Sequence, residues 1–207
     1  MDWALSKHPV QLCFLISKFI SYERKIFLSN NIFDVITQRR STRVFSNKTV
    51  SKDNLVKIAE AARMTPTSVN QQSRKFTIVQ NEKLIKQLDQ TLSGYGFSLY
   101  NPNAILLISS PKNNTYSQIE TGLAVQNAYL AATALGLGTV WTDQIRGRCD
   151  EPAIRSILSK MDIPDNHICW CVLPIGVPDE SSISKNRTEE INYIGPSAEE
   201  SSDFNIS

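Results

Sequence analysis

The sequence predicts an α+β fold in which helices cover both faces of a sheet, giving a three-layer sandwich. Short apolar runs typical of buried strands alternate with longer runs whose apolar residues have helical spacing, and glycine or proline separates them. The chain has 207 residues, enough for one domain with a sizeable core. Hydrophobic residues make up 41% of the chain and charged residues 20%, as in an ordinary globular protein.

Helical spacing of apolar residues predicts five helices. Ser51 precedes one of them at the N-cap position. The longest is rich in alanine, has Glu120 near its start, where a negative charge is favourable, and ends before Gly136, a residue suited to a left-handed cap. The predicted helices lie around residues 32–36, 55–62, 82–92, 119–135 and 152–158.

Four apolar runs predict buried strands at residues 76–79, 104–108, 139–142 and 168–175. Cys169 and Cys171 alternate in the last run, which predicts that both lie on one face of that strand. We interpret them as small buried hydrophobic residues, since free cysteine is usually buried.

Composition and charge disfavour several other classes of protein. The chain has 22 Lys and Arg against 20 Asp and Glu, a net charge of +2 that does not indicate a nucleic-acid or membrane partner. The four cysteines lack CxxC pairs, so we expect neither a zinc site nor a disulfide framework, and no metal. The apolar run 10–20 is shorter than the roughly 18 residues of a membrane span and no small-residue cleavage site follows it, so we expect a cytoplasmic protein.

Four polar segments are candidates for chemistry. Residues 39–43 (RRSTR) put three guanidinium and two hydroxyl groups just after a predicted helix. A helix C-terminus repels anions, so a phosphate here must be held by the side chains, for which arginine is well suited. The other segments are residues 66–72, 136–143 and 185–187. Taken singly, each segment is also compatible with an ordinary polar turn.

In this order, the segments resemble the FMN-dependent nitroreductase family. The resemblance runs from Phe33 to Arg187 and includes RRSTR, the run from Ala61 to Gln72 (AAR, then PTSxNxQ), the strand FTIV, GLAVQNAYLAATALGLGT at 122–139, the strand ending in IGVP at 175–178 and KxR at 185–187. It implies a three-layer α/β/α sandwich with a mostly antiparallel central sheet, in an interlocked homodimer with FMN at the subunit interface. Residues 31–195 are then the FMN-binding domain, 1–30 an N-terminal extension of unknown role and 196–207 a disordered tail.

The resemblance also implies which residues contact the flavin. The first basic segment would bind the phosphate and the ribityl chain, and the segment that begins at Pro66 would contact the flavin of the partner subunit. The segment after the longest helix would lie along the face of the ring, and the last segment would close over the phosphate. In that order the residues are Arg39, Arg40, Ser41 and Arg43; Pro66, Thr67, Ser68 and Asn70; Trp141, Thr142, Asp143 and Gln144; Lys185 and Arg187. No acid–base residue is assigned, and Arg43 is the candidate for an electrostatic role near the ring.

The activity that the resemblance implies is a ping-pong oxidoreductase. NAD(P)H delivers hydride to flavin N5, and a small organic acceptor such as a nitroaromatic or a quinone then takes it from the same ring face. Two alternatives stay open: a flavin-binding or regulatory protein with little turnover, and a related flavin enzyme such as a reductive dehalogenase. The chain departs from the family pattern at Ser73 and Arg74, where a proline and an aromatic residue are common, and in the short region 80–103, which predicts either a more open active site or a different lid over it.

Overall fold

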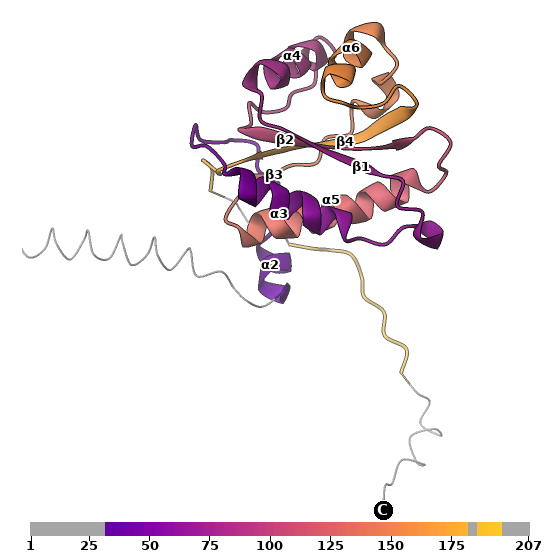
Figure 1. The fold of residues 1–207 in the computed structure, drawn as a ribbon. Coiled ribbons are helices and arrows are strands. Elements are labelled where there is room, and N and C mark those ends of the chain that lie inside the picture. Colours follow the sequence, from indigo (N-terminus) through magenta and orange to yellow (C-terminus); the bar gives the residue numbers. More distant parts are fainter. Residues whose placement is uncertain (1–31, 182–185, 196–207) are drawn as a thin grey trace, which may run out of the picture.

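The computed structural model describes residues 32–181 and 186–195. The expected N-terminal extension 1–30, the expected tail 196–207 and Lys185 lie outside these residues. Two layers of helices enclose one sheet (Figure 1), which confirms the predicted three-layer α+β architecture. No helix in the described part of the chain is long and apolar enough to cross a membrane.

The sheet has four strands in the order β1-β2-β4-β3, and every neighbouring pair is antiparallel. This confirms the antiparallel sheet that the family resemblance implied. Every residue from Ala104 to Ser110 in β2 is buried, because helices cover both faces of this central strand. The strands are β1 (Lys75–Val79), β2 (Ala104–Pro111), β3 (Gly138–Thr139) and β4 (His167–Gly176).

Helices α3 and α5 cover one face of the sheet, with α2 packed against α5, and α4 and α6 cover the other (Figure 1). Each layer has its own apolar core: Leu55 and Leu106 belong to the first, Leu88 and Leu107 to the second. Ser51 caps α3 as predicted, because its Oγ accepts from the backbone N–H of Asn54 at 3.2 Å. The helices are α2 (Ile32–Gln38), α3 (Lys52–Arg63), α4 (Glu82–Ser93), α5 (Ser117–Ala134) and α6 (Pro152–Lys160), with short 3-10 turns at Ser68–Asn70 and Arg146–Arg148.

All five predicted helices are present, and three of the four predicted strands have nearly the expected bounds. The prediction of a strand over 139–142 was wrong, because β3 ends at Thr139. Beyond it the backbone N–H of Trp141 turns away from the sheet to donate to the hydroxyl of Tyr129, and Thr142 forms only an isolated bridge with Val172. The predicted strand was therefore too long, because the hydroxyl of Tyr129 accepts the backbone N–H of Trp141 outside the sheet.

The prediction that Cys169 and Cys171 share one strand face was also wrong. In the pairing of β2 with β4, Ile108 lies opposite Cys171 and Ser109 opposite Cys169, so Trp170 is an extra residue in the ladder. Such a bulge breaks the two-residue alternation of side chains. Cys171 accordingly packs in the core under α3 and α5, and Cys169 in the core under α4 and α6. Both thiols are buried and free, as expected.

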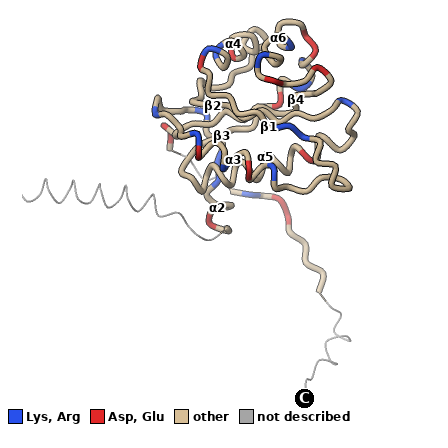
Figure 2. Tube along the Cα trace, viewed as in Figure 1, with Lys and Arg blue, Asp and Glu red and all other residues tan. Residues whose placement is uncertain are grey.

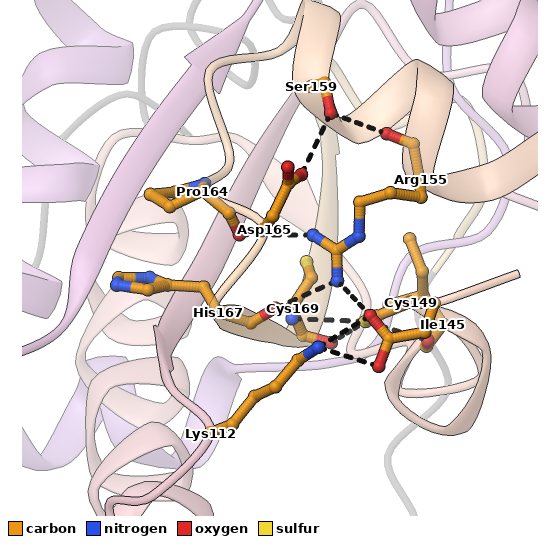
Figure 3. A network of polar contacts seen from close by, with 10 residues as sticks. Lys112, Ile145, Cys149, Arg155, Ser159, Pro164, Asp165, His167 and Cys169 are labelled. Atoms are coloured by element: carbon orange, nitrogen blue, oxygen red, sulfur yellow. Dashed lines mark hydrogen bonds and ion pairs between the residues drawn. The ribbon is translucent and has the colours of Figure 1, made fainter. Parts of the chain in front are cut away.

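A polar network joins α6 to the start of β4 (Figure 3). The guanidinium of Arg155 donates to the backbone carbonyls of Pro164 and His167, both at 3.1 Å, and to the carboxylate of Asp150 at 2.8 Å. Lys112 donates to both oxygens of the same carboxylate at 2.8 Å. The network fixes the loop before β4 to the helix layer that lies away from RRSTR. Figure 2 shows that acidic and basic residues occur together in this layer.

The imidazole of His167 predicts a loss of stability in mild acid. Burial lowers the pKa of His167 from its ordinary 6.5, and the charges of Lys75 and Arg155 lower it further. Because the unfolded chain then binds the proton first, the free energy of unfolding should fall as the pH drops from 6.5 towards the folded-state pKa. We expect His167→Gln to flatten this decline, measured by urea unfolding between neutral pH and about pH 5. An unchanged pH dependence in the variant would contradict the assignment.

Candidate functional site

The RRSTR segment begins where α2 ends. The guanidinium Nη1 of Arg40 donates to the backbone carbonyls of Thr37, at 2.6 Å, and Arg39, at 2.7 Å. These carbonyls are among the unpaired acceptors that a helix C-terminus leaves, so a cation is favourable there. Arg40 therefore contributes to capping α2, next to the groove that it lines with Ser41 and Thr133.

The middle of the segment is joined to β3. Ser41 forms a parallel bridge with Thr139, and the backbone N–H of Thr42 donates to the carbonyl of Thr139 at 2.9 Å. The side chain of Thr42 is buried and lies against Gly138, where an added Cβ would be 2.5 Å from the Thr42 Oγ1. Only a residue without a side chain at position 138 permits this close approach, which fixes where Ser41 lies.

Tyr129, on α5, contacts two of the predicted flavin-binding segments. Its hydroxyl accepts from the backbone N–H of Trp141 at 2.6 Å and lies 3.3 Å from the Oγ of Ser41. The guanidinium of Arg39 lies over the Tyr129 ring, 5.0 Å from the centroid. The structure thus brings Arg39, Ser41 and Trp141 together around a single side chain that is only 6% exposed.

Two arginines of this segment, Arg39 and Arg43, have guanidinium groups that form no ion pair within the described residues. Elsewhere Arg63, Arg148 and Arg155 each pair with a carboxylate. Arg39 and Ser41, which contact the same Tyr129 side chain, offer the guanidinium and hydroxyl donors that suit a phosphate group.

Glu180 holds the end of the segment through the backbone. Its carboxylate accepts from the backbone N–H of Arg43 at 2.5 Å and of Val44 at 3.3 Å. The side chain of Arg43 stays exposed. Arg187 is exposed in the described C-terminal stretch. The contribution predicted for Lys185 concerns a residue that the structure does not describe.

The segment after β3 presents one large exposed side chain. Trp141 is 53% exposed, and the side chains of Asp143 and Gln144 are half-buried. Thr142 is buried: its Oγ1 donates to the carbonyl of Val172 at 2.7 Å, and its backbone N–H and carbonyl also bond to Val172. Thr142 therefore anchors the segment to β4, and Trp141 is the residue that the anchor holds at the surface.

The loop after α3 is fixed at the other end of α5. The carboxylate of Glu120, which is 3% exposed, accepts from the backbone N–H of Ser68 at 2.8 Å. Arg74 donates to the carbonyl and hydroxyl of Thr65 and to the carbonyl of Glu120. Burial lowers the pKa of Arg74, and the charge of Glu120 opposes this effect.

This loop has an unusual backbone. Val69, Asn70 and Gln72 all have positive φ angles, a backbone conformation that residues other than glycine rarely adopt. Pro66 and Asn70 are exposed, and Thr67 and Ser68 are half-buried. The buried Glu120 therefore holds a strained, outward-facing loop, a combination that favours a binding role over a simple connection.

The two groups of predicted contact residues do not meet within one chain. The loop after α3 bonds to Glu120, whereas Ser41 contacts Tyr129, nine positions further along α5. At about 1.5 Å per residue, these contacts lie roughly 13 Å apart along the helix. The region 80–103 contributes only α4 as a helix, and α4 lies on the opposite face of the sheet. A single described chain therefore presents two separate parts of the predicted site.

Sequence reasoning missed three residues that organise these parts: Tyr129, Glu120 and Glu180. Glu120 was interpreted as a favourable charge near a helix start, and it does lie in the first turn of α5, but its carboxylate is buried against another segment. Tyr129 had one usable signal, a single hydroxyl-bearing aromatic residue within an alanine-rich helix. Glu180 had none, since its partners are backbone groups.

Comparison with known proteins decides the family. The family model described as the nitroreductase family matches residues 36–94 and 94–177. The chain belongs to the nitroreductase family. The two matched stretches include the RRSTR segment, the loop after α3, helix α5 and the segment after β3, so all parts of the candidate site except its C-terminal end lie within the family domain.

Two of the relatives that follow are named for nicotinamide-dependent redox reactions and the third for a deiodination. A candidate NADH dehydrogenase/NAD(P)H nitroreductase of Archaeoglobus fulgidus is 29% identical over 151 residues, which cover 70% of this chain and 84% of the relative. An FMN reductase [NAD(P)H] of Bacillus subtilis is 24% identical, covering 77% of this chain and 73% of the relative. An iodotyrosine deiodinase of Thermotoga neapolitana is 25% identical, covering 77% and 95%.

Solved structures show the same fold. A nitroreductase of Bacteroides fragilis with bound FMN aligns with a TM-score of 0.73 at 25% identity, covering 82% of this chain and 100% of that chain. A nitroreductase of Desulfitobacterium hafniense, also with bound FMN, aligns with a TM-score of 0.71 at 20% identity, covering 80% and 99%.

Proposed function

We propose that this member of the nitroreductase family is an FMN-dependent oxidoreductase that carries hydride from NAD(P)H to a small organic acceptor, such as a nitroaromatic or a quinone. The observation that carries the proposal is the grouping of Arg39 and Ser41 around Tyr129: a guanidinium group that forms no ion pair within the described residues and a serine hydroxyl contact the same side chain. The names of the relatives and the FMN in the similar crystal structures agree with it.

The residues that the proposal assigns to FMN carry suitable groups. Arg39 and Ser41 supply donors for the phosphate group, the family resemblance assigns Lys185 and Arg187 to the same group, and Arg40 adds positive charge while it caps α2. Trp141, held by Tyr129 and by the anchor at Thr142, offers a planar surface beside these donors. Asp143 and Gln144 follow it with polar groups for the edge of the ring.

Bound FMN would supply the redox chemistry, a hydride transfer between a nicotinamide and a second substrate. The residues of the protein then bind the flavin, orient it and polarise its ring. Arg43 has an exposed guanidinium whose backbone is fixed by Glu180, and we assign it to electrostatic stabilisation of negative charge at the pyrimidine edge. The proton that the acceptor takes up along with the hydride comes from solvent in this proposal, so no acid–base residue of the protein is assigned.

The site is completed, in this proposal, by a second copy of the chain. Helix α5 is apolar on the side away from the sheet as well: Ile119 is 68% exposed and Leu123 is 44% exposed, with Gly122 between them opening onto free space. An apolar stripe at helical spacing on a helix that is already packed indicates a protein interface. A homodimer through this stripe accounts for the roughly 13 Å along α5 between the two parts of the site, with Pro66, Thr67, Ser68 and Asn70 facing the flavin of the partner.

Leu123→Lys is expected to dissociate this homodimer. Leu123 is partly exposed in one chain, so the fold should tolerate the change, whereas an unpaired ammonium group at the interface costs several kcal/mol. We expect the dimer dissociation constant to rise at least about a hundredfold, measured by sedimentation. Gln90→Lys adds the same charge on α4 and should leave the dimer intact. A Leu123→Lys protein that stays dimeric, or a monomeric wild type, would refute the interface.

Replacing Arg43 tests the proposed activity. Arg43→Ala should retain the fold and lose flavin or NAD(P)H oxidation rate, because an exposed arginine contributes little to stability. Lys86→Ala is the control, since it removes an exposed cation that pairs with Glu82 on α4, on the opposite face of the sheet. Equal FMN binding and equal rates in both variants would contradict the role of Arg43.

Two alternatives to this function can be distinguished by experiment. The deiodinase among the relatives favours reductive dehalogenation as a second candidate reaction, which a screen of halogenated and nitroaromatic acceptors with the NAD(P)H-reduced protein would distinguish. A flavin-binding protein with little turnover would bind FMN but oxidise neither NADH nor NADPH.

A further inference from the structure

The hydroxyl of Tyr129 forms a chain of polar contacts that ends at the proposed phosphate site. It accepts from the backbone N–H of Trp141 at 2.6 Å, and it lies 3.3 Å from the Oγ of Ser41. Tyr129 itself is 6% exposed and packs in the core under α3 and α5. A buried hydroxyl in such a core is costly unless it is bonded, and here both of its partners belong to segments of the site.

The direction of this series of hydrogen bonds follows from which groups can donate a hydrogen. A backbone N–H only donates, so the Tyr129 oxygen is the acceptor in its contact with Trp141. Tyr129 and Ser41 each carry one hydroxyl hydrogen, and either can donate in the contact between them. The oxygens of an ionised phosphate accept hydrogen bonds. When a phosphate lies beside Ser41, Ser41 therefore donates to it, and Tyr129 is left to donate to Ser41.

We propose, on the basis of the FMN site proposed above, that Tyr129 is a positioning residue: its hydroxyl orients the Ser41 hydroxyl so that Ser41 donates to the FMN phosphate. Hydrogen bonds arranged in one direction polarise one another, which strengthens the last donor of the series. The Tyr129 ring has a separate role, because the Arg39 guanidinium lies over it at 5.0 Å. The hydroxyl and the ring can therefore be tested independently.

A residue that acts through Ser41 on a phosphate must distinguish FMN from riboflavin, the same flavin without the phosphate. A residue that only holds Trp141 or fills the core must affect both flavins alike. Tyr129→Phe removes the hydroxyl and keeps the ring beneath Arg39. Ser41→Ala removes the donor on which Tyr129 is proposed to act.

The test is a titration of the flavin-free dimer with FMN and with riboflavin, in which the quenching of flavin fluorescence measures binding. We expect Tyr129→Phe and Ser41→Ala each to weaken FMN binding roughly tenfold more than riboflavin binding, the scale of one hydrogen bond to a charged group. The double variant should lower the preference for FMN over riboflavin no further than Ser41→Ala does, because both changes remove the same final hydrogen bond. Tyr95→Phe removes a hydroxyl whose partner is Glu151 and should change neither affinity.

Three results would overturn the proposal: equal weakening of FMN and riboflavin by Tyr129→Phe, no weakening at all, or effects of the two variants that multiply in the double variant. If Tyr129→Phe does not fold, Tyr129→Met removes the same hydroxyl with a side chain that adapts to irregular core space. A wild-type protein that binds riboflavin as tightly as FMN would refute the phosphate role while leaving a flavin enzyme intact. A wild-type protein that binds neither flavin would refute the proposed function itself.

Discussion

Gly138→Ala is expected to cost the protein most of its affinity for FMN. A Cβ at this position would lie 2.5 Å from the Oγ1 of Thr42 and 2.6 Å from its Cβ, closer than real side chains approach. Thr42 is buried and its backbone N–H bonds to Thr139, so it has little room to retreat. The contact should separate the RRSTR segment from β3.

The expected size of this effect follows from geometry. Overpacking of this kind costs roughly 1–3 kcal/mol of stability. A displacement of about 1 Å in the residues that position a ligand can reduce activity about a hundredfold, and Ser41 is bridged to Thr139 directly beside the clash. We therefore expect a moderate fall in melting temperature together with a large rise in the FMN dissociation constant.

Gly147→Ala is the matched control, because nothing lies within 4 Å of a Cβ added there. Thr42→Gly in the Gly138→Ala background removes the colliding side chain and should restore part of the FMN affinity. If Gly138→Ala binds FMN as the wild type does, the join between RRSTR and β3 does not position the site.

Glu120→Ala is expected to have the largest effect on stability. The carboxylate of Glu120 is buried and accepts the Ser68 backbone N–H, and the charge of the nearby Arg74 interacts with it. Removing it leaves an unpaired N–H and a half-buried guanidinium, a loss of about 3 kcal/mol. The strained loop that Glu120 holds should then become mobile, with a loss of FMN affinity in the dimer.

Two further variants separate the contributions at this position. Glu120→Gln keeps an acceptor for Ser68 and removes the charge, so it should lose less stability than Glu120→Ala in urea unfolding. Glu60→Ala removes an exposed carboxylate paired with Arg63 and should cost at most about 1 kcal/mol. Equal stability of Glu120→Ala and Glu60→Ala would show that the buried carboxylate does not hold the loop.

Local sequence patterns predicted most elements because their causes are local. Ser51 and Gly136 mark a helix start and a helix end through their own backbone preferences, and the structure confirms both. The bulge at Trp170 was not predictable in this way, because a break in alternation depends on the pairing of β4 with β2. Trp141 likewise leaves the sheet for an acceptor twelve positions earlier in the chain.

The candidate site shows the same division. RRSTR was recognisable because five consecutive residues carry its chemistry, and the order of the segments indicated the family. The contacts that position the segments join residues far apart in sequence: Ser68 with Glu120, and Arg43 with Glu180. Pairs of this kind have no periodicity or spacing that a single sequence reveals, so Tyr129, Glu120 and Glu180 required the structure.

The absorbance spectrum of the protein after incubation with FMN and desalting tests the central claim most directly. The grouping of Arg39 and Ser41 around Tyr129 predicts that the dimer retains FMN in equal numbers with its chains, and that NADH or NADPH bleaches the flavin bands in the absence of oxygen. A colourless protein that takes up no FMN would contradict the account.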